Sequence, residues 1–132
     1  IFLPDERPIG EVLLFGGIEG GSPKGGYWIS PAHTGCGYAT EAVRALVDLA
    51  FLIEGVDLLE FRILAGNERS ERLAERLGFT REALLRHRAT DADGGPKNLT
   101  VWSLLRSEWK RWGTDSLDAF DILGLACGKA SR

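Results

Sequence analysis

Apolar residues recur along this chain with two different periods, and each period predicts one kind of element. Runs rich in aliphatic, β-branched and aromatic residues, bounded by turn residues, are typical of strands. These runs are Ile9–Ile18, Gly26–Ser30, Leu58–Ala65, Glu82–Ala89 and Leu99–Leu105. From Tyr38 the apolar positions follow helical spacing until Gly55, which predicts a helix. A second helix is predicted over Glu68–Leu77, with Asn67 as its N-cap and Gly78 at its end.

The order of these elements predicts the fold class. The predicted order is β-β-β-α-β-α-β-β, with three strands before the first helix, while the apolar run Ile1–Leu3 stops at a proline turn. A helix between two strands implies a parallel crossover, and the polar loop 90–96 implies an antiparallel hairpin. The prediction is an α+β fold, with one parallel strand pair in a mostly antiparallel sheet. One domain is expected over residues 1–109, followed by a C-terminal tail over 110–132 in which the apolar residues between Leu117 and Leu125 allow a short helix.

Composition narrows the class of protein. The chain has 132 residues, a formal net charge of −3 and 27% charged residues, as ordinary soluble globular domains do. Acidic and basic residues alternate, so we expect neither nucleic acid nor a membrane as a partner. No apolar run is long enough to span a bilayer, no signal peptide is visible, and a cytoplasmic location is the default expectation. The absence of methionine predicts that a preceding segment was removed or that the sequence is a fragment.

The segment with the clearest chemical meaning is the turn His33–Thr40, which joins a strand to the first helix. The first amides of a helix have no partners within the helix, and the helix dipole places partial positive charge there. Gly35 and Gly37 remove the Cβ atoms that would hold an anion away, so this turn predicts a backbone cradle for phosphate. The alternative is an ordinary glycine-rich turn. A dinucleotide fingerprint lacks its third glycine here, and a P-loop lacks its Gly-Lys-Ser/Thr.

The same segment resembles a known family. Gly26–Pro31 and Gly35–Ala42, followed by Asn67–Ser70 and Leu77–Phe79, look like the GNAT superfamily of acyl-CoA N-acyltransferases. Together with the last strand and Glu108-Trp109, they are most similar to the branch of ribosomal-protein N-acetyltransferases that modify alanine or serine N-termini. The resemblance covers roughly Ile9–Trp109. It implies a GNAT-like sheet that lacks the family's first strand and first two helices, and therefore the walls of its acceptor site.

The resemblance also implies roles for individual residues. The turn Thr34–Ala39 would hold the pyrophosphate of acetyl-CoA, although Thr34 stands where the family usually has glutamine or arginine. Pantetheine would enter a gap between the strands Tyr27–Ser30 and Leu58–Ala65, and Asn67 would bond it. The implied coenzyme-binding set is Trp28, Ile29, Ser30, Thr34, Gly35, Cys36, Gly37, Tyr38, Ala39, Thr40, Asn67 and Ser70. Ser70 would also be catalytic, because a hydroxyl there protonates the leaving thiolate in similar enzymes.

Several of these residues also have a simpler, purely structural interpretation. Asn67 is also a good helix N-cap, and Ser70 is also an ordinary small helix residue. Tyr27, Trp28 and Phe79 are residue types that more often belong to a core than to a site. Cys36 is expected to contribute its backbone amide. A covalent mechanism through Cys36 would need a nearby base, and His33 makes this a minor alternative.

The expected reaction is direct attack of a neutral amine on the thioester carbonyl. A strand amide near Ile29 would stabilise the tetrahedral oxyanion, and no metal is needed. The general base is not identified. Glu11, Glu82 and His87 are candidates on strands, and Asn98 stands where similar proteins often carry aspartate.

Partners follow from the same expectation. They are acetyl-CoA and an amine acceptor, either a protein N-terminus or a small molecule, with a homodimer as one possible assembly. The missing walls predict that the chain binds acyl-CoA but needs a partner for full activity. Two other classes of function stay open: a non-catalytic acyl-CoA sensor, and an interaction module that pairs its sheet edge with another strand.

Overall fold

The computed structural model describes residues 1–17 and 21–110. The strands within these ranges are β1 (Gly10–Phe15), β2 (Lys24–Ile29), β3 (Leu58–Leu64), β4 (Thr80–Thr90) and β5 (Pro96–Leu105). The helices are α1 (Tyr38–Leu52) and α2 (Glu68–Arg76), with short 3-10 turns η1 (Pro31–His33) and η2 (Arg106–Glu108). Neither helix of the described part is long and apolar enough to cross a membrane. The helix anticipated near Leu117 lies outside the described residues.

The predicted order has one strand too many before the first helix. Ile1–Leu3 does not form a strand, and only Phe2 makes an isolated antiparallel bridge, to Pro8. The chain turns back at once, because the amides of Leu3 and Glu6 bond to the carbonyls of Arg7 and Leu3. Prolines at both ends of this turn lack the N–H that a longer ladder would need. Two strands, rather than three, therefore precede α1.

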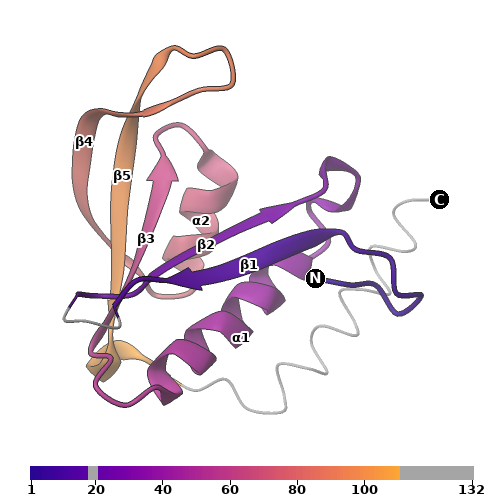
Figure 1. Cartoon of the computed structure of the whole chain (residues 1–132), viewed down its shortest axis with the longest axis horizontal. Helices are drawn as coiled ribbons and strands as arrows, with labels where there is room; N and C mark the ends of the chain where they lie inside the picture. Colours follow the sequence, from indigo (N-terminus) through magenta and orange to yellow (C-terminus); the bar gives the residue numbers. More distant parts are fainter. Residues whose placement is uncertain (18–20, 111–132) are drawn as a thin grey trace.

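The strands form a single sheet in the order β1-β2-β3-β5-β4 (Figure 1). Every neighbouring pair is antiparallel except β2 and β3, which are parallel. The predicted α+β class, with one parallel pair in a mostly antiparallel sheet, is confirmed. The parallel pair arises because α1 carries the chain from the end of β2 back to the start of β3.

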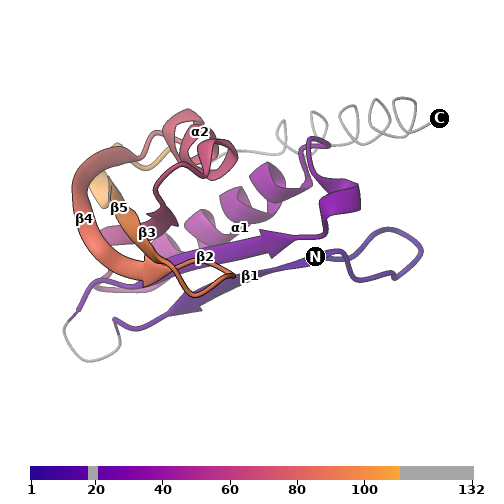
Figure 2. The ribbon, with the colours of Figure 1, turned by 90° about the horizontal axis from the view of Figure 1, so that it is seen from above.

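Both helices cover the same face of the sheet (Figure 2). Alternate residues of β3, namely Leu59, Phe61 and Ile63, point to that face and are at most 6% exposed. They pack in one core cluster with apolar residues of α1 and α2. Burying one such side chain stabilises a fold by about 1.5–3 kcal/mol, so this layer is the main source of stability.

Gly25 brings β2 against the core at the point where it meets β3. In the parallel register Gly25 stands opposite Phe61, whose ring lies in contact with the ring of Phe79 at a centroid distance of 5.0 Å. A Cβ added at Gly25 would lie 2.5 Å from Cζ of Phe61. Only glycine therefore lets this strand pass over the buried ring.

Gly25→Ala is expected to lower the free energy of unfolding by about 1–3 kcal/mol, the usual cost of overpacking a core. Gly26→Ala is the matched control on the same strand, because the nearest atom to its new Cβ would be Cε1 of Phe15 at 3.8 Å. Chemical denaturation of both variants measures the difference. Equal stability of the two variants would show that the contact between Gly25 and Phe61 does not constrain the strand.

Candidate functional site

A gap opens between the two parallel strands. β2 and β3 share two residue pairs, Lys24 with Glu60 and Gly25 with Phe61, whereas six pairs join β1 to β2 and seven join β3 to β5. Antiparallel ladders are slightly more stable per residue than parallel ones, so each strand stays with its antiparallel neighbour. Figure 1 shows β2 and β3 starting side by side and then pointing apart. The predicted divergence of these strands is present.

The register of β1 and β2 turns main-chain groups toward this gap. The amide of Ser30 donates to the carbonyl of Ile9, so Ser30 points its N–H at the β1 side. Successive residues of a strand alternate in the direction of their N–H and C=O groups. The main-chain groups of Ile29, and of Tyr27 two residues earlier, therefore face away from β1 and into the gap. An extended ligand amide could pair with them as a further strand would.

The amino end of α1 lies at the far end of β2, beyond η1. Gly35 and Gly37 both have positive φ, 77° and 81°, and Gly37 is the N-cap without a side-chain cap bond. The first backbone hydrogen bond of the helix runs from Glu41 N to Gly37 O at 3.1 Å. The amides of the residues before Glu41 therefore precede the helix's own hydrogen-bond ladder. Thr34 uses its hydroxyl within the turn, where Oγ1 donates to the carbonyl of Pro31 at 3.0 Å.

The amino end of α2 faces the gap from the other strand. Asn67 is the N-cap of α2, and its Oδ1 accepts from the amide of Ser70 at 3.4 Å. The simple reading of Asn67 is thus correct, and its contact with a coenzyme stays a prediction. Ser70 turns its hydroxyl across the gap, where Oγ lies 2.8 Å from the hydroxyl oxygen of Tyr27.

These parts line one cleft of about 580 Å³. Nine of the twelve predicted coenzyme-binding residues line it: Trp28, Ile29, Thr34, Gly35, Gly37, Ala39, Thr40, Asn67 and Ser70. Ser30, Cys36 and Tyr38 do not line it, although they adjoin residues that do. The structure therefore brings most of the predicted set together, and their individual roles stay predictions.

Sequence reasoning missed six residues of the same cleft: Tyr27, His33, Arg44, Arg69, Leu73 and Arg76. Tyr27 was interpreted as a core residue. Its ring does pack against the core cluster, while its hydroxyl reaches Ser70. A signal for two of the others was present, because residues at successive three-residue steps after Ser70 stay near one side of α2. That spacing indicates Leu73 and Arg76.

Burial and charge act in opposite directions on the Tyr27 hydroxyl. Burial raises its pKa, while the hydrogen bond with Ser70 and the charges of Arg76 and Arg69 lower it in part. The net direction is upward, so the hydroxyl keeps its proton at neutral pH. It can then donate a hydrogen bond to the Ser70 oxygen.

The three candidates for the general base lie elsewhere. The Glu11 carboxylate accepts from Nε1 of Trp28 at 3.2 Å, and the Glu82 carboxylate accepts from Oγ of Ser103 at 2.6 Å. His87 lies in a β4 bulge with φ at 51°, where its amide donates to Oδ1 of Asn98 at 3.1 Å. None of these three side chains lines the cleft. Within the ranges that the structure describes, no group of His, Cys, Asp and Glu side chains could hold a metal ion.

Comparison with known proteins identifies relatives. The family model described as "Acetyltransferase (GNAT) domain" matches residues 1–80. In Bacillus subtilis (strain 168), "Probable N-acetyltransferase YjcK" is 39% identical over 84 residues, which make up 62% of this chain and 46% of that protein. "Putative ribosomal N-acetyltransferase YdaF" of the same organism is 38% identical over 87 residues, or 64% of this chain and 46% of that protein. The chain thus spans about half the length of these relatives.

Solved structures agree with this likeness. A crystal structure described as a "Probable acetyltransferase" superposes with a TM-score of 0.74 and 30% identity, over 80% of this chain and 60% of the other. The ribosomal-protein-S5-alanine acetyltransferase from Vibrio fischeri superposes with a TM-score of 0.71 over 80% of this chain and 58% of its own. At 20% identity, this second match shows a shared fold.

The Tyr27 hydroxyl is expected to titrate above its ordinary pKa of 10.0. The absorbance of tyrosinate, compared between the wild type and Tyr27→Phe, isolates this titration. Ser70→Ala should move the midpoint further up, because the Ser70 hydrogen bond favours the ionised form. A midpoint at or below 10.0 would contradict the buried environment of this hydroxyl.

The sign of the stability effect follows from the raised pKa. Above the pKa of the unfolded chain, the unfolded state loses the Tyr27 proton while the folded state keeps it. The free energy of unfolding should therefore fall as pH rises through 10.0, and the loss should end once the folded state also ionises. Tyr27→Phe should show a smaller fall over the same range.

Proposed function

Because this chain belongs to the GNAT acetyltransferase family, we propose that it binds acetyl-CoA and transfers the acetyl group to a primary amine. The observation that carries the proposal is the short β2–β3 ladder, which leaves a gap between the amino ends of α1 and α2. A gap of this shape suits a long, thin ligand with an anionic end. The acceptor we propose is a protein N-terminus or a small-molecule amine, and a protein N-terminus fits the family branch that the sequence resembles.

The bound donor would lie along β2. Its diphosphate would contact the backbone amides at the amino end of α1, which carry partial positive charge. Its pantetheine amides would pair with the main-chain groups of Tyr27 and Ile29 that face the gap. The thioester would then lie between Ile29 and Ser70. This path uses residues that line the cleft.

The proposed reaction uses the groups that would surround the thioester, between Ile29 and Ser70. The amine, after losing a proton to a base or to water, attacks the carbonyl carbon and forms the C–N bond. The resulting oxyanion accepts a hydrogen bond from the Ile29 amide, and its collapse breaks the C–S bond. The thiolate takes the Ser70 proton while Ser70 takes that of Tyr27, 2.8 Å away. Arg69 and Arg76 favour the transient tyrosinate, which regains the proton that the amine released.

An edge strand favours a second candidate function. No strand of the described residues pairs with the outer edge of β1, where only Ile1 bonds to the carbonyl of Gly10. The β1 side chains Leu13 and Phe15 are 44% and 54% exposed. A sheet edge of this kind can pair with a strand of another chain, including a second copy. Light scattering that shows a dimer, together with no response to acetyl-CoA, would favour this interaction module over the acetyltransferase.

Acetyl-CoA is expected to give measurable heat with the full chain in isothermal titration, and Gly35→Ala should weaken its binding. The added Cβ would point into the cradle that we assign to the diphosphate. Gly94→Ala is the matched control, because Gly94 also has a positive φ, 81°, with no atom near its new Cβ. Both variants carry a similar backbone strain of about 1–2 kcal/mol. Wild-type protein that gives no heat would refute the donor site, and equal binding by the two variants would refute the cradle.

Ser70→Ala is expected to lower kcat on the order of 100-fold, the lower range for loss of a proton donor, with little change in the KM for acetyl-CoA. Tyr27→Phe should lower kcat less, because Ser70 keeps its own hydroxyl. Thiol release with a panel of amines measures both, and Ser107→Ala on the exposed turn η2 is the control. Binding without thiol release from any amine would favour a non-catalytic acyl-CoA sensor. A rise in KM alone would give Ser70 a binding role.

A further inference from the structure

A fully buried hydroxyl links the first turn of α2 to the sheet. Thr100, on β5, is 0% exposed and lies opposite Ile63 in the β3–β5 ladder. Its Oγ1 accepts from Nε1 of Trp102 at 3.0 Å. Its single proton can be donated to the carbonyl of Ile63 at 3.0 Å or to Oε1 of Glu71 at 3.1 Å. One hydroxyl therefore connects β3, β5 and α2.

This link has the properties of a contact that fixes a geometry. A hydroxyl in an apolar core costs free energy unless it is hydrogen-bonded, so a satisfied one favours the single arrangement that satisfies it. Glu71 is half-buried, and within residues 1–17 and 21–110 it forms no ion pair. Its carboxylate contacts the Thr100 hydroxyl instead. The bond between them therefore holds α2 in one position on the sheet.

Ser70 precedes Glu71 directly in the same helical turn. Successive residues of a helix point about 100° apart, so this turn directs the two side chains to different strands. Oγ of Ser70 lies 2.8 Å from the hydroxyl oxygen of Tyr27 on β2, while Glu71 reaches β5. A shift of the turn that breaks the second contact would displace the first as well.

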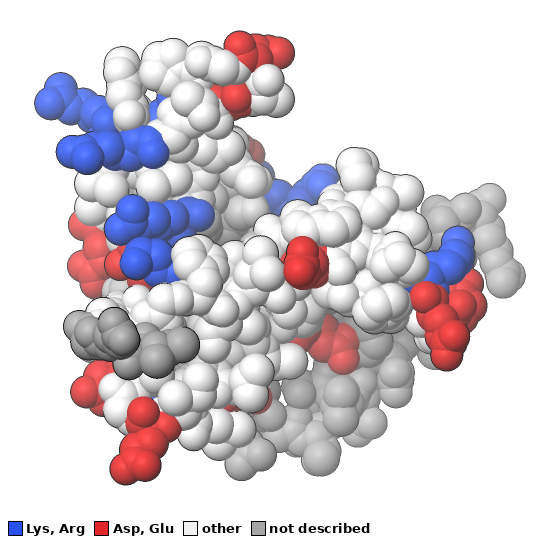
Figure 3. Space-filling model, in the orientation of Figure 1, with Lys and Arg blue, Asp and Glu red and all other residues white. Residues whose placement is uncertain are grey.

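The gap makes the position of α2 decisive for Ser70. Figure 3 shows the surface hollowed between the β4–β5 hairpin and the β1–β2 pair. The helix packs against β3 and β4, whereas Tyr27 belongs to β2, beyond the gap. How far Ser70 reaches toward Tyr27 therefore depends on how α2 is fixed to the sheet.

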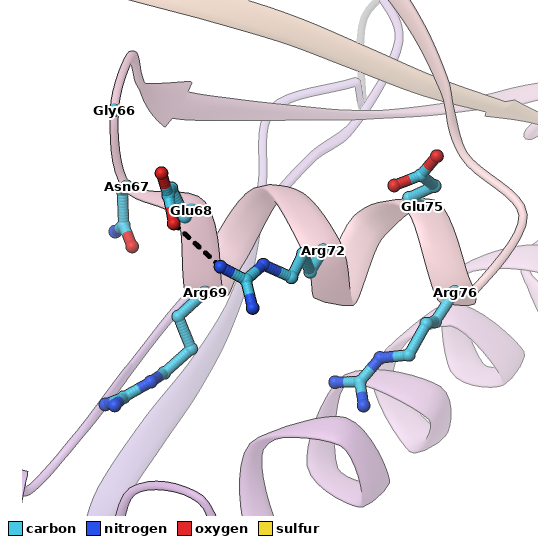
Figure 4. A pocket seen from close by; sticks show the side chains of 7 residues that line it. All are labelled: Gly66, Asn67, Glu68, Arg69, Arg72, Glu75 and Arg76. Atoms are coloured by element: carbon cyan, nitrogen blue, oxygen red, sulfur yellow. Dashed lines mark hydrogen bonds and ion pairs between the residues drawn. The ribbon is translucent and has the colours of Figure 1, made fainter.

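A second acidic residue in this turn provides a comparison. Glu68 bonds to Nη2 of Arg72 at 2.7 Å along the exposed surface of the helix, as Figure 4 shows. Both Glu68 and Glu71 place a carboxylate near the amino end of α2, where the helix dipole favours negative charge. An effect of Glu71 that exceeds that of Glu68 must therefore come from its contact with the sheet.

We propose that Glu71 and Thr100 are positioning residues, whose hydrogen bond fixes α2 so that the Ser70 hydroxyl lies against that of Tyr27. Neither side chain lines the cleft, so both act through Ser70. Their effect on catalysis rests on the proposed function, in which Ser70 gives its proton to the leaving thiolate. The positioning itself can be measured without any substrate.

The absorbance of tyrosinate measures it. Burial raises the pKa of Tyr27 and the Ser70 hydrogen bond lowers it in part, as do the nearby charges of Arg76 and Arg69. Glu71→Ala should raise the titration midpoint of Tyr27 by about one pH unit, the usual effect of losing a hydrogen bond to an ionised group. Loss of a negative charge alone would lower the midpoint, because a carboxylate disfavours a nearby tyrosinate. The two causes therefore differ in sign.

Further variants separate the hydrogen bond from the charge. Glu71→Gln removes the charge but keeps an oxygen that accepts from Thr100, so the midpoint should stay near that of the wild type. Thr100→Val removes the hydroxyl without changing the charge and should raise the midpoint as Glu71→Ala does, while Thr100→Ser should restore it. Each variant is compared with the same variant carrying Tyr27→Phe, and circular dichroism checks that it is folded.

Thiol release with a panel of amines measures the catalytic effect in the same variants. Glu71→Ala and Thr100→Val should lower kcat about tenfold, because a misplaced catalytic group slows the reaction. The loss should be smaller than for Ser70→Ala, since the hydroxyl is displaced rather than removed. The KM for acetyl-CoA should change little, and Glu71→Gln and Thr100→Ser should keep kcat near that of the wild type.

Glu68→Ala is the matched control, because it removes an acidic side chain from the same turn that bonds to Arg72. It should leave the midpoint and kcat unchanged. An unchanged or lowered midpoint in Glu71→Ala or Thr100→Val, or an equal rise in Glu68→Ala, would overturn the positioning role. A raised midpoint with unchanged kcat would overturn the role of Ser70 in the reaction. Wild-type protein that releases no thiol would overturn the proposed function, and the titration would still decide the positioning.

Discussion

The short contact between β2 and β3 is the constraint on which the rest of the structure depends. Two residue pairs join these strands, and the contact lies where Gly25 passes over the ring of Phe61. A longer ladder would consume the main-chain groups of Tyr27 and Ile29 and close the cleft. A shorter one would separate the β1–β2 pair from the three strands that carry most of the core. The site thus exists because the sheet is joined at one end and open at the other.

The open end gathers groups that lie far apart in the sequence. Tyr27 on β2 and Ser70 on α2 form a hydrogen bond across the opening, 43 residues apart. The amino ends of both helices face the same space, so their dipoles add to the charge of the arginines. Burial keeps the Tyr27 hydroxyl protonated while those charges limit the rise of its pKa. The same geometry underlies both proposed roles, anion binding at the amino end of α1 and proton transfer at Ser70.

Local sequence patterns were sufficient for most elements. Gly35 and Gly37 predicted a cradle because they lack the Cβ that would hold an anion away. Both residues have positive φ, and the cradle itself stays a prediction. Asn67 predicted the start of α2 because its side chain can satisfy a helix amide, as it does with Ser70. The predicted order counted one strand too many before α1, where Ile1–Leu3 makes only one isolated bridge beside a proline turn. The resemblance to a family then supplied the roles that propensity cannot supply.

By itself the sequence determined where most strands and helices form. It also determined the glycine-rich turn before α1 and the position of Ser70 in the first turn of α2, after the N-cap Asn67. These features depend on side chains and backbone angles within a few residues of one another. Only the tertiary structure decided that β2 and β3 part after two pairs, that Tyr27 reaches Ser70, and that Arg69 and Arg76 join the same cleft. Those contacts depend on the packing of the helices on one face of the sheet and on the competition between parallel and antiparallel ladders. No local pattern encodes either one.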